Sequence, residues 1–270
     1  MAERILSSLD LGDWAEHYAA DRGFYGHFKD EVYPLFIRLL ADLPVKARVL
    51  DVGAGPGNLA REFHRANPDH QLDWVLLDAS AELLSIARKR LAGRSVTAIN
   101  RSFNADDWAA EIGRVDAIVS NNALFHLKPE GIGGFYAGCC GVLRPGGFLL
   151  NQQSFAWTAS VPPHDGAFPG PLRSRLQQAL PSRETLSEEA EEALAREHRD
   201  ARQRHQEAIR NARDSGVAIG DGYPPYQFVT VERHVNAMRE AGLAAGTVWR
   251  KLEFAVICGL KPKDPSGAGL

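Results

Sequence analysis

This sequence of 270 residues has few cysteines, no long apolar run and little net charge. Its three cysteines, Cys139, Cys140 and Cys258, are odd in number and include an adjacent pair, which makes a poor disulfide framework and gives no metal-ligand spacing. No apolar run approaches the roughly 20 residues that span a bilayer, and no N-terminal segment has the form of a signal peptide. We therefore expect a reduced, cytoplasmic protein that does not bind a membrane.

Positive charge is not in excess either. The formal net charge is −3 and the isoelectric point is near 6.3, so the composition does not favour nucleic acid as a partner. The nine histidines are scattered without a metal-binding spacing, so we expect no metal. Hydrophobic residues make up 44% of the chain, enough for one large core or for one domain with a sizeable insertion.

The run VLDVGAGPGNLA, residues 49–60, predicts a buried strand, a glycine-rich turn and the start of a helix. Gly53, Gly55 and Gly57 remove the Cβ atoms where the backbone bends and approaches a ligand, and the N–H groups of the helix N-terminus face that ligand. A dinucleotide fingerprint would need glycine where Asn58 stands. A phosphate-binding P-loop would need Gly-Lys-Ser/Thr after the turn, which is absent.

The observed pattern, D-x-G-x-G-x-G, resembles the first motif of the class I S-adenosylmethionine-dependent methyltransferases. The resemblance implies an α/β fold: a doubly wound, seven-stranded, mostly parallel sheet that is Rossmann-like with an antiparallel last strand. It implies S-adenosylmethionine as the cofactor, with the strand carboxylate, Asp51, fixing the turn and the cofactor's amino group. The other cofactor contacts that it implies in this region are Gly53, Ala54, Gly55 and Asn58.

Asp78 follows a second expected strand, residues 72–77. A carboxylate at the carboxyl end of this strand is where an open α/β sheet places the acceptor for the ribose hydroxyls, and Ala79 adjoins it. Dehydrogenases share this feature, so it supports adenosine binding without separating the two families. The alternative is that Asp78 only precedes Ser80, the expected N-cap of the next helix.

A third strand is expected at residues 95–101, followed by the letters NADDW. At this place the family carries an acidic residue that meets the adenine amino group. Asp106 is the better match and Asp107 the alternative. A helix N-cap before Trp108 would account for the other member of the pair.

The fourth strand, residues 115–119, leads into SNNALFHL, which resembles the fourth-strand motif of small-molecule methyltransferases. Its carboxyl end should lie beside the sulfonium and the acceptor, with Ser120 and Asn121 on the cofactor and Asn122 and His126 as the catalytic candidates. A neutral imidazole at His126 can act as general base. Alternatively, His126 packs under the loop and only bonds a backbone carbonyl.

The remaining elements complete the resemblance. A glycine-rich helix is expected at residues 130–143, and LRPGGFLL, residues 143–150, matches the family's turn into the fifth strand. A helix at residues 231–241 precedes two closely spaced strands in TVWRKLEFAVICGLKP. Such a final hairpin, with one strand antiparallel to the others, occurs in class I methyltransferases and not in dehydrogenases.

We divide the chain into an N-terminal helical cap segment (residues 1–44), the cofactor-binding domain (45–154 and 229–262), a helical cap insertion (155–228) and a C-terminal tail (263–270). The insertion is Pro- and Gly-rich at first and then strongly helical with balanced charge, so we expect it to close over the acceptor together with the N-terminal helices. Tyr18 and Tyr25 are the preferred aromatic pair for the cofactor side. The candidates for substrate contact are Tyr25, Phe155, Trp157 and Tyr226.

The leading interpretation is therefore methyl transfer to oxygen, nitrogen or carbon of a small molecule, with S-adenosylhomocysteine as product. Because this is a direct displacement, it needs alignment, exclusion of water and sometimes removal of a proton. Two alternatives stay open: transfer or cyclisation of the aminocarboxypropyl arm, which releases methylthioadenosine, and a non-catalytic cofactor-binding module. The sequence leaves the oligomeric state open, a homodimer included.

Overall fold

The computed structural model describes residues 29–156, 227–251 and 254–263, together with the isolated positions 207, 210, 211, 214 and 215. The segment before residue 29, nearly all of the insertion and most of the C-terminal tail lie outside these residues. The expected cap and its division from the cofactor-binding domain therefore remain predictions.

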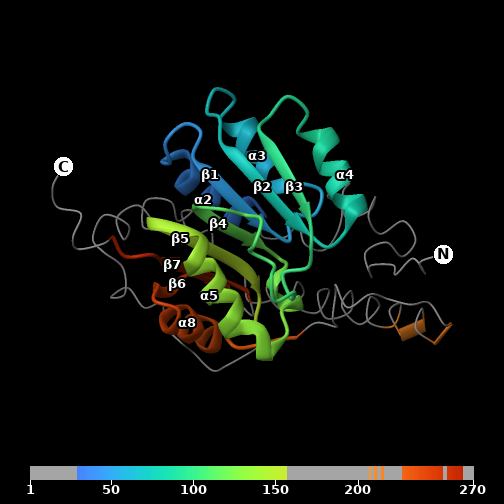
Figure 1. Ribbon diagram of the computed structural model, residues 1–270, viewed down its shortest axis with the longest axis vertical. Coiled ribbons are helices and arrows are strands. Elements are labelled where there is room, and N and C mark those ends of the chain that lie inside the picture. Colours follow the sequence, from blue (N-terminus) through green and yellow to red (C-terminus); the bar gives the residue numbers. More distant parts are fainter. Residues whose placement is uncertain are drawn as a thin grey trace, which may run out of the picture.

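A seven-stranded sheet forms the centre of the molecule (Figure 1). The strands are β1 (Arg48–Val52), β2 (Asp73–Asp78), β3 (Val96–Asn100), β4 (Val115–Asn121), β5 (Leu143–Ser154), β6 (Ala244–Lys251) and β7 (Phe254–Leu260). Their order is β3-β2-β1-β4-β5-β7-β6, and β1 to β5 are parallel, whereas β7 runs antiparallel to both β5 and β6. This arrangement confirms the predicted sheet, including its antiparallel last strand.

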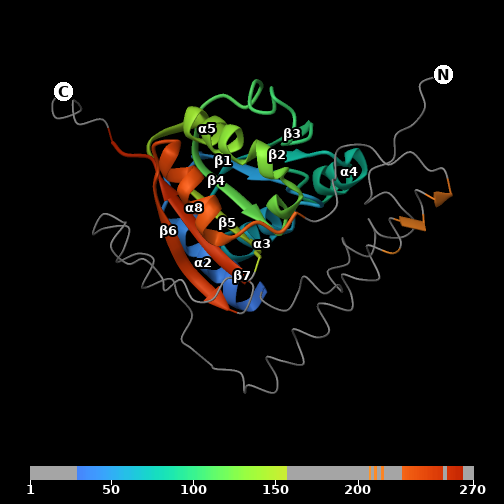
Figure 2. The ribbon, with the colours of Figure 1, turned by 90° about the horizontal axis from the view of Figure 1, so that it is seen from below.

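Helices cover both faces of the sheet (Figure 2). One face is covered by α2 (Lys29–Ala41), α3 (Asn58–Ala66) and α4 (Ala81–Arg90), and the other by α5 (Ile132–Val142) and α8 (Val231–Glu240). Two short 3₁₀ helices, η3 (Leu124–His126) and η4 (Pro129–Gly131), follow β4. Because successive strand residues point to opposite faces, Val49 enters the first core and Leu50 the second.

The strand order reverses between β1 and β4, because β1 continues to β2 on one side of the sheet and β4 occupies the other side. At such a switch point the loops after the two strands diverge and leave a crevice at the carboxyl edge, where ligands of open α/β sheets bind. The glycine turn and the SNNALFHL segment both begin at this edge, as the sequence predicted.

Two local expectations were wrong. Residues 143–150, expected as a turn into the fifth strand, belong to β5 itself, where residues 145–147 make a bulge because Val115 pairs with Leu143 while Ala117 already pairs with Phe148. After β3, the expected helix around Trp108 is a series of turns, in which the Trp108 N–H donates to the Ala105 carbonyl at 3.1 Å.

Candidate functional site

The turn after β1 is built around three left-handed glycines. Gly53, Gly55 and Gly57 have φ values of 68°, 52° and 72°. A Cβ atom on Gly53 would lie 2.2 Å from the Cβ of Ala123, so only glycine lets this turn approach the segment after β4 so closely. The D-x-G-x-G-x-G spacing thus reflects backbone geometry at the switch point.

Asp78 fastens this turn to the end of β2. One carboxylate oxygen accepts the Gly55 N–H at 2.8 Å, and the other accepts the Ser80 N–H at 2.8 Å. The Gly53 N–H also donates to the Leu77 carbonyl at 2.8 Å. Ser80 caps α4 by accepting the Leu83 N–H at 3.1 Å, so Asp78 does precede a capping residue and has a second structural role as well.

Asp51 lies one strand away from Asp78, and each residue is only 2% exposed. Burial, and then the neighbouring charge of Asp78, raise the pKa of Asp51 to about 8. Burial beside Asp78 therefore favours the protonated form of Asp51.

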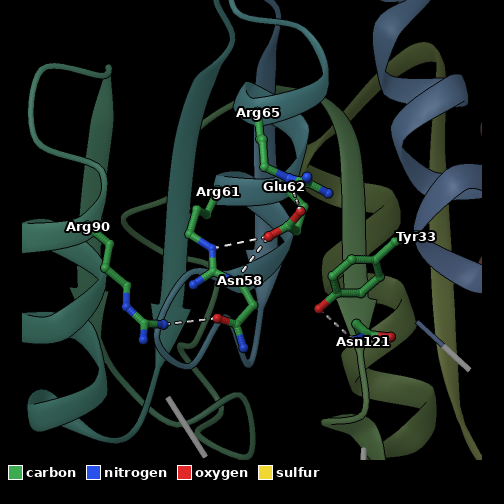
Figure 3. A network of polar contacts seen from close by, with 7 residues as sticks. All are labelled: Tyr33, Asn58, Arg61, Glu62, Arg65, Arg90 and Asn121. Atoms are coloured by element: carbon green, nitrogen blue, oxygen red, sulfur yellow. Dashed lines mark hydrogen bonds and ion pairs between the residues drawn. The ribbon is translucent and has the colours of Figure 1, made fainter. Parts of the chain in front are cut away.

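The first turn of α3 is tied to α4 by a polar contact (Figure 3). Arg90 donates to the side-chain oxygen of Asn58 at 3.0 Å, so part of the hydrogen-bonding capacity of Asn58 is used inside the protein. Further along α3, Glu62 pairs with Arg61 at 3.0 Å and with Arg65 at 2.6 Å.

The end of β4 brings polar side chains to the same edge. The Ser120 hydroxyl donates to the Val52 carbonyl at 2.9 Å, and the Asn121 amide contacts the Tyr33 hydroxyl of α2 at 3.4 Å (Figure 3). The Asn122 backbone has a φ of 53°, unusual for a residue with a side chain, and its N–H donates to the Gln152 carbonyl at 2.7 Å. Within the described part of the chain, the buried side-chain oxygen of Asn122 has no hydrogen-bond partner.

His126 ends the short helix η3 and is 6% exposed. Its ring lies against Phe125, with a centroid distance of 4.6 Å, and its backbone carbonyl accepts the Asn104 amide at 3.0 Å. The Asn104 side-chain oxygen in turn accepts the Lys128 N–H at 2.9 Å. Asn104 therefore holds the loop that carries His126.

The two carboxylates proposed for adenine both lie on the surface. Asp107 is 68% exposed and pairs with Arg101 at 2.8 Å. Asp106 is exposed as well.

Ala79, the residue after Asp78, is half-buried, and its carbonyl accepts the Asn100 amide at 2.8 Å.

Phe155, a proposed substrate contact, is buried in the core under α8, where its ring meets the edge of His234 at 5.3 Å. The same core holds a polar group around His234, whose Nδ1 lies 2.8 Å from the Tyr136 hydroxyl and whose Nε2 lies 3.4 Å from the Gln153 amide nitrogen. The other aromatic candidates, Tyr18, Tyr25, Trp157 and Tyr226, lie outside the described residues.

The sequence interpretation did not include Tyr33, Asn104 or Gln152 in the site. Tyr33 lies in the segment assigned to the N-terminal cap, residues 1–44, and Asn104 begins the NADDW segment. Both residues therefore lie in segments to which the sequence assigned a role. Their contacts with Asn121 and with the His126 loop join parts of the chain far apart in sequence, which no local pattern indicates.

In the part of the chain that the structure describes, no His, Cys, Asp or Glu side chains gather in a group of three or more that could hold a metal ion. None of the helices described there is long and apolar enough to cross a membrane.

The sheet order and the glycine turn define an α/β fold whose switch point lies at the carboxyl ends of β1 and β4. Residues 49–147 match the family model described as a methyltransferase domain. This match covers little more than a third of the chain, and the fold is that of the methyltransferase structures described below. No curated protein matches the chain.

Several solved structures share this fold. An O-methyltransferase family protein from Burkholderia thailandensis is 15% identical, with a TM-score of 0.54, over 93% of this chain and 60% of its own. The CurJ carbon methyltransferase is 14% identical, with a TM-score of 0.57, over 96% of this chain and 62% of its own. DhpI in complex with SAH is 14% identical, with a TM-score of 0.54, over 93% and 92%. The chain thus spans about 60% of the length of the first two.

Proposed function

We propose that this chain transfers the methyl group of S-adenosylmethionine to a small-molecule acceptor at oxygen, nitrogen or carbon. The observation that carries the proposal is the turn of three left-handed glycines at the switch point, fastened to β2 by the bond from Gly55 to Asp78. The methyltransferase-domain match over residues 49–147 supports the same conclusion.

On the cofactor side, Asp78 receives the ribose hydroxyls. Each carboxylate oxygen can accept more than one hydrogen bond, so the bonds from Gly55 and Ser80 leave capacity for a ligand. Asp51 is placed for the amino group, Asp106 for the adenine, and Gly53 with its neighbours for the methionine part. Asp107 is the weaker adenine candidate because Arg101 already binds it.

On the acceptor side, Asn122 and His126 follow β4, where the acceptor would meet the sulfonium. Asn122 offers a buried side-chain oxygen that can accept a hydrogen bond from the acceptor. His126 removes the acceptor's proton where the nucleophile carries one. When bound, the cofactor supplies the electrophilic methyl group, and the chain's own task is to align the acceptor and exclude water.

A small-molecule acceptor is supported by the net charge of −3, which gives no advantage to a polyanion. The O-methyltransferase and carbon methyltransferase named above share the fold, which is consistent with either type of acceptor atom. All three cysteines are free, which supports a reducing compartment such as the cytoplasm.

Calorimetry with S-adenosylhomocysteine tests the cofactor site, and we expect a dissociation constant in the micromolar range, about −8 kcal/mol. NAD is the control ligand, and binding of NAD without S-adenosylhomocysteine would overturn the proposal. Mass analysis of products with candidate metabolites then tests the chemistry. S-adenosylhomocysteine is the expected product, whereas methylthioadenosine would indicate transfer or cyclisation of the aminocarboxypropyl arm.

A further inference from the structure

Two buried carboxylates face each other across neighbouring strands of the candidate cofactor site. Asp51 pairs in register with Leu76, and Asp78 lies two residues further along β2, so both side chains lie on the same face of the sheet. Each is 2% exposed. Two negative charges in such a place are unfavourable, so the pair holds a proton at neutral pH.

The hydrogen bonds favour ionisation of Asp78 over Asp51. Both oxygens of Asp78 accept backbone N–H groups, from Gly55 and from Ser80, each at 2.8 Å, and such bonds favour the charged carboxylate. Asp51 is buried beside that charge, and the two effects together raise its pKa to about 8. The proton of the pair therefore resides on Asp51.

Other charges near this face do not explain the shift. Asp51 lies on the face covered by α2, α3 and α4. The ionisable side chains described on these helices and just after α2 are Glu31, Tyr33, Arg38, Asp42, Arg61, Glu62, His64, Arg65, Glu82, Arg88, Lys89 and Arg90. Glu62 is paired with Arg61 and Arg65. On β4, Asp116 is paired with Arg144. Burial and the charge of Asp78 are the causes that act on Asp51.

We propose that binding of the S-adenosyl ligand is coupled to release of the proton that Asp51 holds. The inference rests on the proposed function, since it takes the amino-acid part of the ligand to lie beside Asp51. An ammonium group there favours the ionised carboxylate. The Asp51 O–H bond breaks, the proton goes to solvent, and the carboxylate pairs with the ammonium.

Calorimetry in buffers of different ionisation enthalpy counts the protons released. At pH 7 we expect close to one proton per S-adenosylhomocysteine bound, and almost none for methylthioadenosine, which lacks the amino-acid part. Linkage then requires the dissociation constant for S-adenosylhomocysteine to fall about tenfold per pH unit between about pH 6 and pH 7. At pH values above the pKa of Asp51, the release of a proton on ligand binding should disappear.

Asp51→Asn is the decisive variant, because asparagine keeps the neutral shape of the protonated side chain and carries no such proton. It should bind S-adenosylhomocysteine without proton release. Asp69→Asn is the matched control, because it removes an exposed carboxylate outside the candidate site and should leave the proton count unchanged.

The outcomes separate the two proposals. If the unmodified chain fails to bind S-adenosylhomocysteine at any pH, the proposed function is wrong and this inference is wrong with it. Binding without proton release overturns the inference alone. Proton coupling through Asp51 is also wrong if Asp51→Asn still releases a proton, or if methylthioadenosine releases as many protons as S-adenosylhomocysteine.

Discussion

At the scale of single residues, Asp78 has a structural role and a proposed ribose-binding role, which two measurements on one variant can separate. Its oxygens hold the N–H groups of Gly55 and Ser80, so Asp78→Ala removes two buried hydrogen bonds as well as the proposed ribose contact. Asp78→Asn keeps the size and one acceptor. We expect Asp78→Asn to weaken S-adenosylhomocysteine binding by about 1.5 to 3 kcal/mol, the usual contribution of hydrogen bonds to a charged group.

Calorimetry on Asp78→Asn measures the affinity for S-adenosylhomocysteine, and the melting temperature of the same sample measures the stability of the fold. An unchanged affinity would restrict Asp78 to fastening the turn and preceding the cap of α4. Asp69→Asn is the control, because that carboxylate is exposed and lies outside the candidate site.

His126 is the second residue whose role an experiment can decide. Its loop is held through the backbone by Asn104, so replacing the ring leaves that support in place. For His126→Asn we expect a loss of about 10² to 10⁴ in turnover if the ring acts as general base. Turnover under saturating cofactor is compared with the melting temperature, and a variant that melts early but turns over normally assigns the ring to packing.

At the scale of elements, the turn after β1 depends on glycine at a single point of contact with the segment after β4. A Cβ on Gly53 meets Ala123, and the φ of 68° is unfavourable for alanine. Gly53→Ala should therefore lower the free energy of unfolding by about 1 to 3 kcal/mol or abolish the fold. Gly133→Ala in α5 is the control, since a Cβ there meets nothing within 4 Å and should stabilise the helix by about 0.5 to 1 kcal/mol. Chemical denaturation measures the free energy of unfolding of both variants. Equal effects of Gly53→Ala and Gly133→Ala would contradict the close approach of Gly53 to Ala123.

The packing of α8 on β5 includes a buried histidine that must stay neutral. Burial, and then the charge of Arg233, lower the pKa of His234 from 6.5 to about 3. Because the unfolded chain binds this proton more readily, the stability that neutral His234 provides is complete above about pH 6.5 and is lost as the pH falls toward 3. We expect His234 to add about 1.4 kcal/mol per pH unit to the fall in stability across this range. Denaturation of the wild type and of His234→Gln at several pH values checks the difference in slope, and parallel slopes would contradict it.

Elements were predictable where one local pattern decided them. The glycine turn, the ends of β4 and the stop of α8 before Gly242 follow from strand composition and turn chemistry. The bulge at residues 145–147 and the turns after β3 were not predictable, because pairing with β4 and packing override the local preference. Trp108 shows this: instead of starting a helix, its ring packs against Gly138 of α5, where a Cβ would lie 2.9 Å from it.

At the scale of the whole molecule, one sheet separates two cores, and the candidate site lies at the edge where both meet. The carboxyl ends of β1, β2 and β4 were predictable as the place of the site, because a switch point is fixed by strand order. The contacts that complete the site, such as Tyr33 on Asn121, come from packing of α2 against the sheet and required the structure.

A ligand that binds the carboxyl ends of β1, β2 and β4 requires the folded sheet, so its binding should stabilise the fold as a whole. For one site, the stabilisation is about 2.7 kcal/mol when the ligand is present at 100 times its dissociation constant. We expect S-adenosylhomocysteine to raise the melting temperature of the chain in proportion to the logarithm of its concentration, and NAD at the same concentrations to leave it unchanged. Thermal denaturation followed by circular dichroism measures both cores together. If calorimetry shows S-adenosylhomocysteine binding while the melting temperature stays constant, the ligand does not prefer the folded chain, which would contradict a site built from the folded strand ends.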